Sequence, residues 1–254
     1  SGKHNNWSIS VDGKNLLEPG DDPIQNMRFI VMLTCIIRAV DEYQDLLRMT
    51  TATAGNDHRL GGDEAPPSII SMFLGDELDR VVTAIMEGSD YHSNGNAKMD
   101  LGVDVLPNFD QANTDRNRTS PFAFTGNKFE FRMPGSAQNL SDVNMVLNTA
   151  MADSLCKFAD DLEGKSGEEF NKACQEWIRE TLKAHCRIIF NGDGYSKEWE
   201  EEAKRRGLSN LKDTAKALPA LVTEKSYALF SKFSVLNKDE VDCRYNVKLE
   251  KYNK

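Results

Sequence analysis

Residues 128–133 read Lys-Phe-Glu-Phe-Arg-Met, a strict alternation of apolar and charged side chains up to Arg132. Successive side chains of a β-strand point to opposite faces, so this stretch predicts a strand with Phe129 and Phe131 buried. Lys128, Glu130 and Arg132 then share the other face. From the residues alone, that face is either a solvated one with paired charges or the lining of a polar site.

The remaining elements follow from the spacing of apolar residues on either side of this strand. Trp7–Val11 alternates in the same way and predicts a second strand, which ends at the turn of residues 12 and 13. Helical spacing predicts helices over Ile24–Met49, Ser68–Met86, Ser141–Leu162, Glu168–Phe190, Lys197–Arg206, Pro219–Phe233 and Asp239–Tyr252. A loop is expected at residues 55–57. Ser89–Thr119 shows neither the helical nor the strand spacing of apolar residues, which is typical of a functional or mobile segment.

The composition limits the classes of function. The 254 residues are 39% hydrophobic, enough for one large domain or two small ones. With 31 Lys and Arg against 40 Asp and Glu, the net charge of −9 disfavours general nucleic-acid binding. No run approaches the roughly 20 apolar residues of a membrane span, so no membrane partner is expected. Five scattered cysteines favour reduced thiols and a cytoplasmic location.

Two clusters of charged residues, 58–67 and 116–132, carry arginines beside glycine or proline. Irregular backbone of this kind presents side chains to ligands. The planar guanidinium of Arg59, Arg116 or Arg118 suits a carboxylate or a phosphate, since it can donate two parallel hydrogen bonds. A ligand with several anionic groups is one interpretation. The alternative is surface ion pairing, which contributes about 0–1 kcal/mol for each pair.

Three further side chains are candidates for site chemistry. His4, at the entry of the first strand, could bind a metal through its imidazole or could serve as a structural hydrogen-bond donor. Glu130 is the matching carboxylate, and the two together with phosphate and water would suit Mg²⁺. Glu64, between Gly62 and Pro66, could act as a general base on a moving loop. Its alternative function is to stabilise the positive end of the following helix.

The order of four segments points to a family. Residues 1–8 (Ser-Gly-Lys-His-Asn-Asn-Trp-Ser), 59–67 (Arg-Leu-Gly-Gly-Asp-Glu-Ala-Pro-Pro), 117–119 (Asn-Arg-Thr) and 128–132 (Lys-Phe-Glu-Phe-Arg) together resemble the catalytic half of glutamine synthetases. The resemblance is to the large bacterial type III branch. It implies ATP-dependent joining of ammonia to the side-chain carboxylate of glutamate through a γ-glutamyl phosphate, with Mg²⁺ or Mn²⁺ as cofactor.

The resemblance also implies a role for individual residues. The implied metal ligands are His4 and Glu130. The implied ATP-binding residues are Asn6, Trp7, Ser8, Arg118 and Lys128. The implied glutamate-binding residues are Arg59, Glu64, Arg118 and Arg132. Two of these are implied to be catalytic: Arg118 neutralises the transferring phosphoryl group, and Glu64 accepts a proton from ammonium.

The same resemblance implies an architecture. We expect an α+β fold of the glutamine synthetase catalytic type, in which a few antiparallel strands carry the site and long helices wrap them. Residues 1–133 would form the C-terminal part of the catalytic core with its flap loop, and 134–254 a mostly helical extension. The parent would be a homo-oligomer, a dodecamer of stacked hexamers. We expect the chain to be a fragment that is inactive alone, because upstream family residues complete the metal sites.

Two other functions remain open at this stage. The first is a related ligase that joins glutamate to another amine or to a polyamine. The second is a non-catalytic relative retained for assembly or regulation. The joint presence of His4, Glu64, Arg118, Glu130 and Arg132 argues against this second function, since a relative without catalysis has no chemical need for all five.

Overall fold

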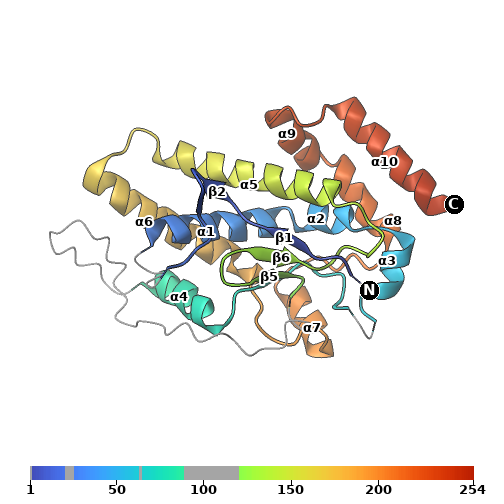
Figure 1. The fold of residues 1–254 in the computed structure, drawn as a ribbon, viewed down its shortest axis with the longest axis horizontal. Coiled ribbons are helices and arrows are strands. Elements are labelled where there is room, and N and C mark those ends of the chain that lie inside the picture. Colours follow the sequence, from blue (N-terminus) through green and yellow to red (C-terminus); the bar gives the residue numbers. More distant parts are fainter. Residues whose placement is uncertain (1, 21–25, 63–64, 89–119) are drawn as a thin grey trace.

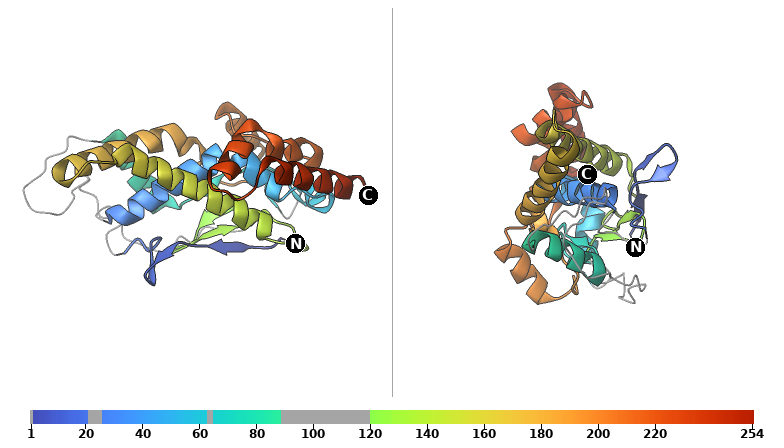
Figure 2. Two further views of the ribbon diagram at one scale, coloured as in Figure 1. Left: turned by 90° about the horizontal axis from the view of Figure 1, so that it is seen from above. Right: turned by 90° about the vertical axis from the view of Figure 1, so that its left-hand side faces the viewer.

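The computed structural model describes residues 2–20, 26–62, 65–88 and 120–254, in which a small sheet lies against a layer of helices (Figure 1). Figure 2 shows the strands along one side of the molecule and the long helices on the other. The α+β fold class is confirmed. The predictions for Ser89–Thr119, Glu64, Arg116 and Arg118 fall outside the described residues.

The sheet has four strands in the order β1-β6-β5-β4. They are β1 (Asn5–Trp7), β6 (Phe129–Phe131), β5 (Phe122–Phe124) and β4 (Met72–Phe73). The pairs β1–β6 and β6–β5 are antiparallel, as expected, but β4 pairs with β5 in parallel, so the sheet is mixed. A separate hairpin, β2 (Ser10–Val11) with β3 (Lys14–Asn15), follows β1.

Phenylalanines hold the inner face of the sheet against the helices. Phe122 and Phe129 stack with ring centroids 4.9 Å apart, and the ring centroid of Phe124 lies 5.9 Å from that of Phe29 in helix α1 (Met27–Glu42). The predicted strand at residues 128–133 is therefore confirmed, with β6 as its hydrogen-bonded centre. Strand β5 reads Phe-Ala-Phe and is buried at all three positions, so it lacks the alternation of apolar and charged residues that marks β6 in the sequence.

The helices form most of the remainder. They are α1 (Met27–Glu42), α2 (Gln44–Thr50), α3 (Ala54–Arg59), α4 (Asp76–Glu87), α5 (Ser141–Leu162), α6 (Gly167–His185), α7 (Lys197–Arg205), α8 (Thr214–Ala217), α9 (Glu224–Lys232) and α10 (Lys238–Asn253), with 3₁₀ turns η2 (Cys186–Ile188) and η3 (Leu218–Val222). Of the described helices, none combines the length and the apolar composition that a membrane crossing requires.

Four predictions in the N-terminal half were wrong in detail. The single strand predicted at Trp7–Val11 is two strands, because residues 8 and 9 separate β1 from β2. The long helix at 24–49 is divided at Tyr43, and its start is capped by Asn26, whose side chain accepts from the Phe29 amide. Residues 55–57 are not a loop but part of α3, because Thr53 caps that helix. The helix predicted at 68–86 begins only at Asp76; the residues before it form β4, since a short apolar run does not distinguish strand from helix.

The helices predicted after residue 134 agree better with the structure. The element predicted at 168–190 ends as a helix at His185, because the last residues turn and run beside β4. Ile189 forms a parallel bridge with Met72, and the Phe190 amide donates to the Met72 carbonyl at 2.8 Å. The element predicted at 219–233 is divided into η3 and α9 by Thr223, which caps α9.

Candidate active site

The outer face of the sheet, turned away from the helices, collects polar side chains. The pairing of β1 with β6 places Asn6 opposite Glu130. Asn5 and Trp7 are buried on the inner face, as are both phenylalanines of β6, whereas Asn6 is exposed and Glu130 is half-buried. The alternation seen in the sequence therefore sorts charged groups onto one face.

His4 and Glu130 form the closest contact on this face. The His4 Nδ1 lies 2.8 Å from the Glu130 Oε1, although 126 positions separate them in the sequence. The His4 side chain is 47% exposed and that of Glu130 is 16% exposed, so the pair opens to solvent on the histidine side. The contact runs diagonally between β1 and β6, a separation that long side chains bridge.

Arg132 lies on the same face, next to this pair. Its Nε is 4.0 Å from the Glu130 Oε2, and its Nη2 donates to the Ser120 carbonyl at 2.7 Å. The side chain is only 9% exposed. The Ser120 hydroxyl in turn donates to the Phe190 carbonyl at 2.8 Å. A buried guanidinium held at a fixed position is thus oriented before any ligand binds.

Arg59 is fixed where β6 ends. Its Nε donates to the Asn56 side chain at 2.8 Å, and its Nη2 donates to the carbonyls of Met133 and Pro134. Burial lowers the pKa of the Arg59 guanidinium, and the nearby Tyr195 opposes that shift. Within the described residues, only Nη1 is left without a hydrogen-bond partner. Arg59 therefore has a structural function in addition to any contact with a ligand.

The backbone explains why this position needs Asn56 and Arg59. Asn5 pairs with Phe131, and Gly2 pairs with Gly135. Three steps along the chain separate Gly2 from Asn5, but four separate Phe131 from Gly135, so the segment that continues β6 contains a bulge. The Met133 carbonyl accepts from the Asn56 side chain at 3.0 Å as well as from Arg59. Sequence reasoning missed Asn56, because nothing local marks it as a partner of residue 133.

The residues implied for the nucleotide separate into two groups. Asn6 and Lys128 are exposed, and the Ser8 hydroxyl donates to the Asn15 side chain at 2.6 Å, so these three border the outer face and the hairpin. Trp7 lies on the opposite face, 9% exposed, with its indole nitrogen donating to Asn148 of α5 at 2.8 Å. The structure does not bring its side chain to the other candidates.

A divalent cation fits the His4–Glu130 pair in part. An imidazole nitrogen and a carboxylate oxygen are acceptable ligands for such an ion, and their 2.8 Å contact already places them together. Across the described ranges there is no cluster of three or more histidine, cysteine, aspartate or glutamate side chains that could hold a metal. Further ligands would have to be phosphate oxygens, water or groups beyond these residues.

Glu64 and Arg118 lie outside the described residues, so their implied roles stay predictions. The ends of the segment around Glu64 are described: the Gly61 amide bonds to the carbonyls of Ala65, at 3.2 Å, and Pro66, at 3.0 Å. Gly61 has a φ of 78°, a left-handed conformation that favours glycine. These bonds fasten the two ends of the segment together directly after α3.

Comparison with known proteins identifies a family with similar sequences. Residues 173–254 match the family described as the glutamine synthetase C-terminal domain. Over its full length, the chain is 46% identical to a glutamine synthetase of Butyrivibrio fibrisolvens, and over 99% of its length 42% identical to one of Bacteroides fragilis (strain YCH46). The chain thus matches the glutamine synthetase family, both in this C-terminal domain and in its similarity to these relatives along its own length.

Within that family, the chain is similar to the type-3 form. It is 51% identical over its full length to a protein of Dictyostelium discoideum named type-3 glutamine synthetase. The chain spans about a third of these relatives, 35–36% of their length. The residues that match the C-terminal domain contain none of the predicted site residues, which all lie between His4 and Arg132.

Proposed function

We propose that this chain contributes part of the active site of a glutamine synthetase. In the proposed reaction, a side-chain carboxylate oxygen of glutamate bonds to the terminal phosphorus of ATP while the bond to ADP breaks. The nitrogen of ammonia then attacks the carbonyl carbon of γ-glutamyl phosphate, and phosphate leaves. The observation that carries the proposal is the 2.8 Å contact between His4 and Glu130 beside Arg132 on one face.

The described residues have distinct functions in this scheme. His4 and Glu130 would hold a divalent cation, which when bound neutralises charge on the phosphate oxygens of ATP. Arg132 would bind a carboxylate of glutamate, because its guanidinium is buried and already oriented by the Ser120 carbonyl. Asn6 and Lys128 would contact the nucleotide at the edge of the same face.

The two catalytic roles come from the family resemblance. Arg118 would stabilise the charge that develops on the transferring phosphoryl group, and Glu64 would take the proton that ammonium must lose before it can attack. Phosphoryl transfer depends chiefly on positioning and on charge stabilisation, so groups fixed in advance lower the barrier without a cost of reorganisation. The hydrogen bonds of Arg59 and Gly61 hold the base of the segment that carries Glu64.

Release of phosphate and formation of glutamine by the full-length protein test the proposal. With ATP, glutamate and ammonia we expect both products in equal amounts. Arg132→Lys should raise the KM for glutamate by at least about tenfold, since lysine cannot make the paired hydrogen bonds of arginine. Arg244→Lys is the matched control, because Arg244 is exposed on α10.

Two results would overturn the proposal. An unchanged KM for glutamate in Arg132→Lys would remove Arg132 from the substrate site. Faster phosphate release with putrescine than with ammonia would instead assign the protein to ligases that join glutamate to larger amines.

We also propose that the full-length protein is a homo-oligomer. Light scattering of the purified protein measures its molar mass and so tests this proposal.

A further inference from the structure

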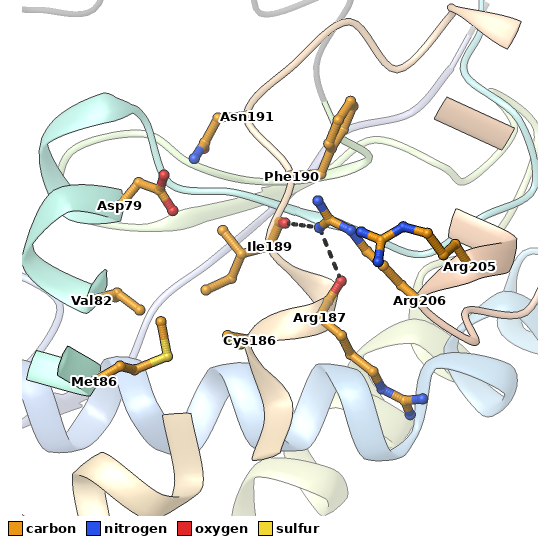
Figure 3. Close-up of a pocket in the computed structure, with 10 residues that line it drawn as sticks. All are labelled: Asp79, Val82, Met86, Cys186, Arg187, Ile189, Phe190, Asn191, Arg205 and Arg206. Atoms are coloured by element: carbon orange, nitrogen blue, oxygen red, sulfur yellow. Dashed lines mark hydrogen bonds between the residues drawn. The ribbon is translucent and has the colours of Figure 1, made fainter. Parts of the chain in front are cut away.

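A cavity of about 410 Å³ lies away from the outer face, at the opposite edge of the sheet (Figure 3). Its walls come from α4, from the turn and extended segment that follow α6, and from the end of α7. The extended segment is bonded to β4, whereas the candidate active site is on β1 and β6. The volume is within the range of small-molecule sites.

One side of the cavity carries a carboxylate held in place by its neighbours. The Asn191 side-chain oxygen accepts from the amides of Leu74, at 2.9 Å, and Gly75, at 3.0 Å. These bonds fix the orientation of the Asn191 amide, so its nitrogen is left to donate to Asp79, with which it is hydrogen-bonded. Burial raises the pKa of Asp79. A cationic ligand group would compensate for that burial.

The other side carries an arginine that is equally fixed. Arg206 donates from Nε to Glu202 at 2.6 Å and from Nη1 to the Ile189 carbonyl at 2.7 Å. Its guanidinium carbon is 5.9 Å from the ring centre of Phe190 and 5.7 Å from that of Trp199. Its Nη2 has no hydrogen-bond partner among residues that the structure describes. Two N–H groups of a rigid guanidinium are therefore available to an anion.

Two further arginines line the cavity, but Arg187 is paired with Asp41 at 2.8 Å and Arg205 with Glu202 at 2.6 Å. Between Asp79 and Arg206 the wall is apolar. Val82 and Met86 of α4 face Ile189 and Cys186 across the cavity. Figure 3 shows Asp79 and Arg206 on opposite sides, with Ile189 between them. A purely anionic ligand would meet the carboxylate, and a purely cationic one would meet the arginine. A ligand with one charge of each sign and a hydrocarbon part matches all three surfaces.

We propose that this cavity binds an α-amino acid with an apolar side chain about the size of leucine. The ammonium group pairs with Asp79, the carboxylate pairs with Arg206, and the side chain packs on Val82, Met86 and Ile189. This inference does not depend on the proposed function, because its residues and its ligand are separate from those of the outer face. If the cavity does not bind an amino acid, the proposed function of the outer face is unaffected, and the reverse also holds.

Calorimetric titration of the full-length protein tests both ends of the ligand. We expect L-leucine to bind, and we expect 4-methylpentanoate, which lacks the amine, and 3-methylbutylamine, which lacks the carboxylate, to bind at least about tenfold more weakly. Asp79→Asn should weaken leucine binding by a similar factor. Asp76→Asn is the matched control, since Asp76 lies in the same first turn of α4 but is exposed and outside the cavity.

A second measurement on the unaltered protein uses the thiol of Cys186. Burial raises the pKa of the Cys186 thiol, so its alkylation by iodoacetamide should be slower than that of a free thiol at about pH 8.5, and leucine in the cavity should slow it further. The exposed Cys243 on α10 is an internal control whose rate should not change. Absence of leucine binding at millimolar concentration, equal binding by the two analogues, or no protection of Cys186 would overturn the proposal.

Discussion

Replacing Trp7 by phenylalanine separates two functions for this residue. The family resemblance implies a contact with the nucleotide, whereas the structure places the indole on the inner face. There it donates to Asn148 at 2.8 Å, and the neighbouring Asn5 donates to Asn144 at 2.9 Å. Two hydrogen bonds, one helical turn apart on α5, therefore fasten β1 to the helical layer.

The cost of this substitution follows from what the indole loses. The hydrogen bond to Asn148 contributes about 1 kcal/mol. The smaller ring buries about 40 Å² less apolar surface, a further loss of about 1 kcal/mol. We therefore expect Trp7→Phe to lower the free energy of unfolding by about 2 kcal/mol. In a unit the size of this chain, that loss lowers the melting temperature by about 4–8 °C.

Thermal melts and ATP kinetics of the full-length protein measure the two functions separately. Asn148→Ala leaves the indole N–H unpaired and should also destabilise, but the double variant should cost about 1 kcal/mol less than the sum of the two, because both remove the same bond. The KM for ATP should stay within about twofold of the unaltered value, since no side chain of the outer face changes.

One combination of results would refute this reasoning. If Trp7→Phe kept its melting temperature but raised the KM for ATP by about tenfold or more, the indole would contact the nucleotide, and its placement on the inner face would be wrong. An additive double variant would show in addition that Trp7 and Asn148 do not interact.

Two further predictions concern titratable groups. Because burial raises the pKa of Asp79, the folded state holds that proton more tightly than the unfolded state, so stability falls as pH rises above about 4 through the raised pKa. Asp79→Asn should therefore melt no lower than the unaltered protein at neutral pH, and a lower melting temperature there would contradict the shift. Burial also raises the pKa of Cys35 to about 12 and that of Cys174 to about 11. Iodoacetamide should thus modify the exposed Cys243 well before either, and mass spectrometry that finds equal rates would contradict their burial.

The parts of the fold that were predicted correctly have a strong local signal. The alternation around Glu130 is compatible with a strand and not with a helix. The helix at Ser141–Leu162 combines an apolar stripe with a glycine at residue 164 that ends it. The parts that were missed depend on distant contacts. Met72 and Phe73 are strand because they pair with β5, and Met72 also bridges to Ile189, which lies more than 110 positions further along the chain.

The candidate site was predictable to the same extent. Alternation in β6 placed Glu130 and Arg132 on one face. The position of His4 at the entry of the first strand made it a candidate ligand, to which the family resemblance gave a role, and the structure brings it within 2.8 Å of Glu130. Asn56 and the inward orientation of Trp7 were not predictable, since each depends on a bond to a residue far away in sequence. The cavity around Asp79 likewise joins three distant segments and leaves no local motif.

The most direct test of the central claim is the affinity of the full-length protein for Mn²⁺, measured by electron paramagnetic resonance. If His4 and Glu130 hold a divalent cation, Glu130→Gln should weaken one cation site by at least about tenfold, because the amide lacks the negative charge of the carboxylate. Glu163→Gln, exposed at the end of α5, should bind Mn²⁺ as the unaltered protein does. Equal affinity in all three proteins would contradict the assignment of the outer face as the metal-binding part of a ligase site.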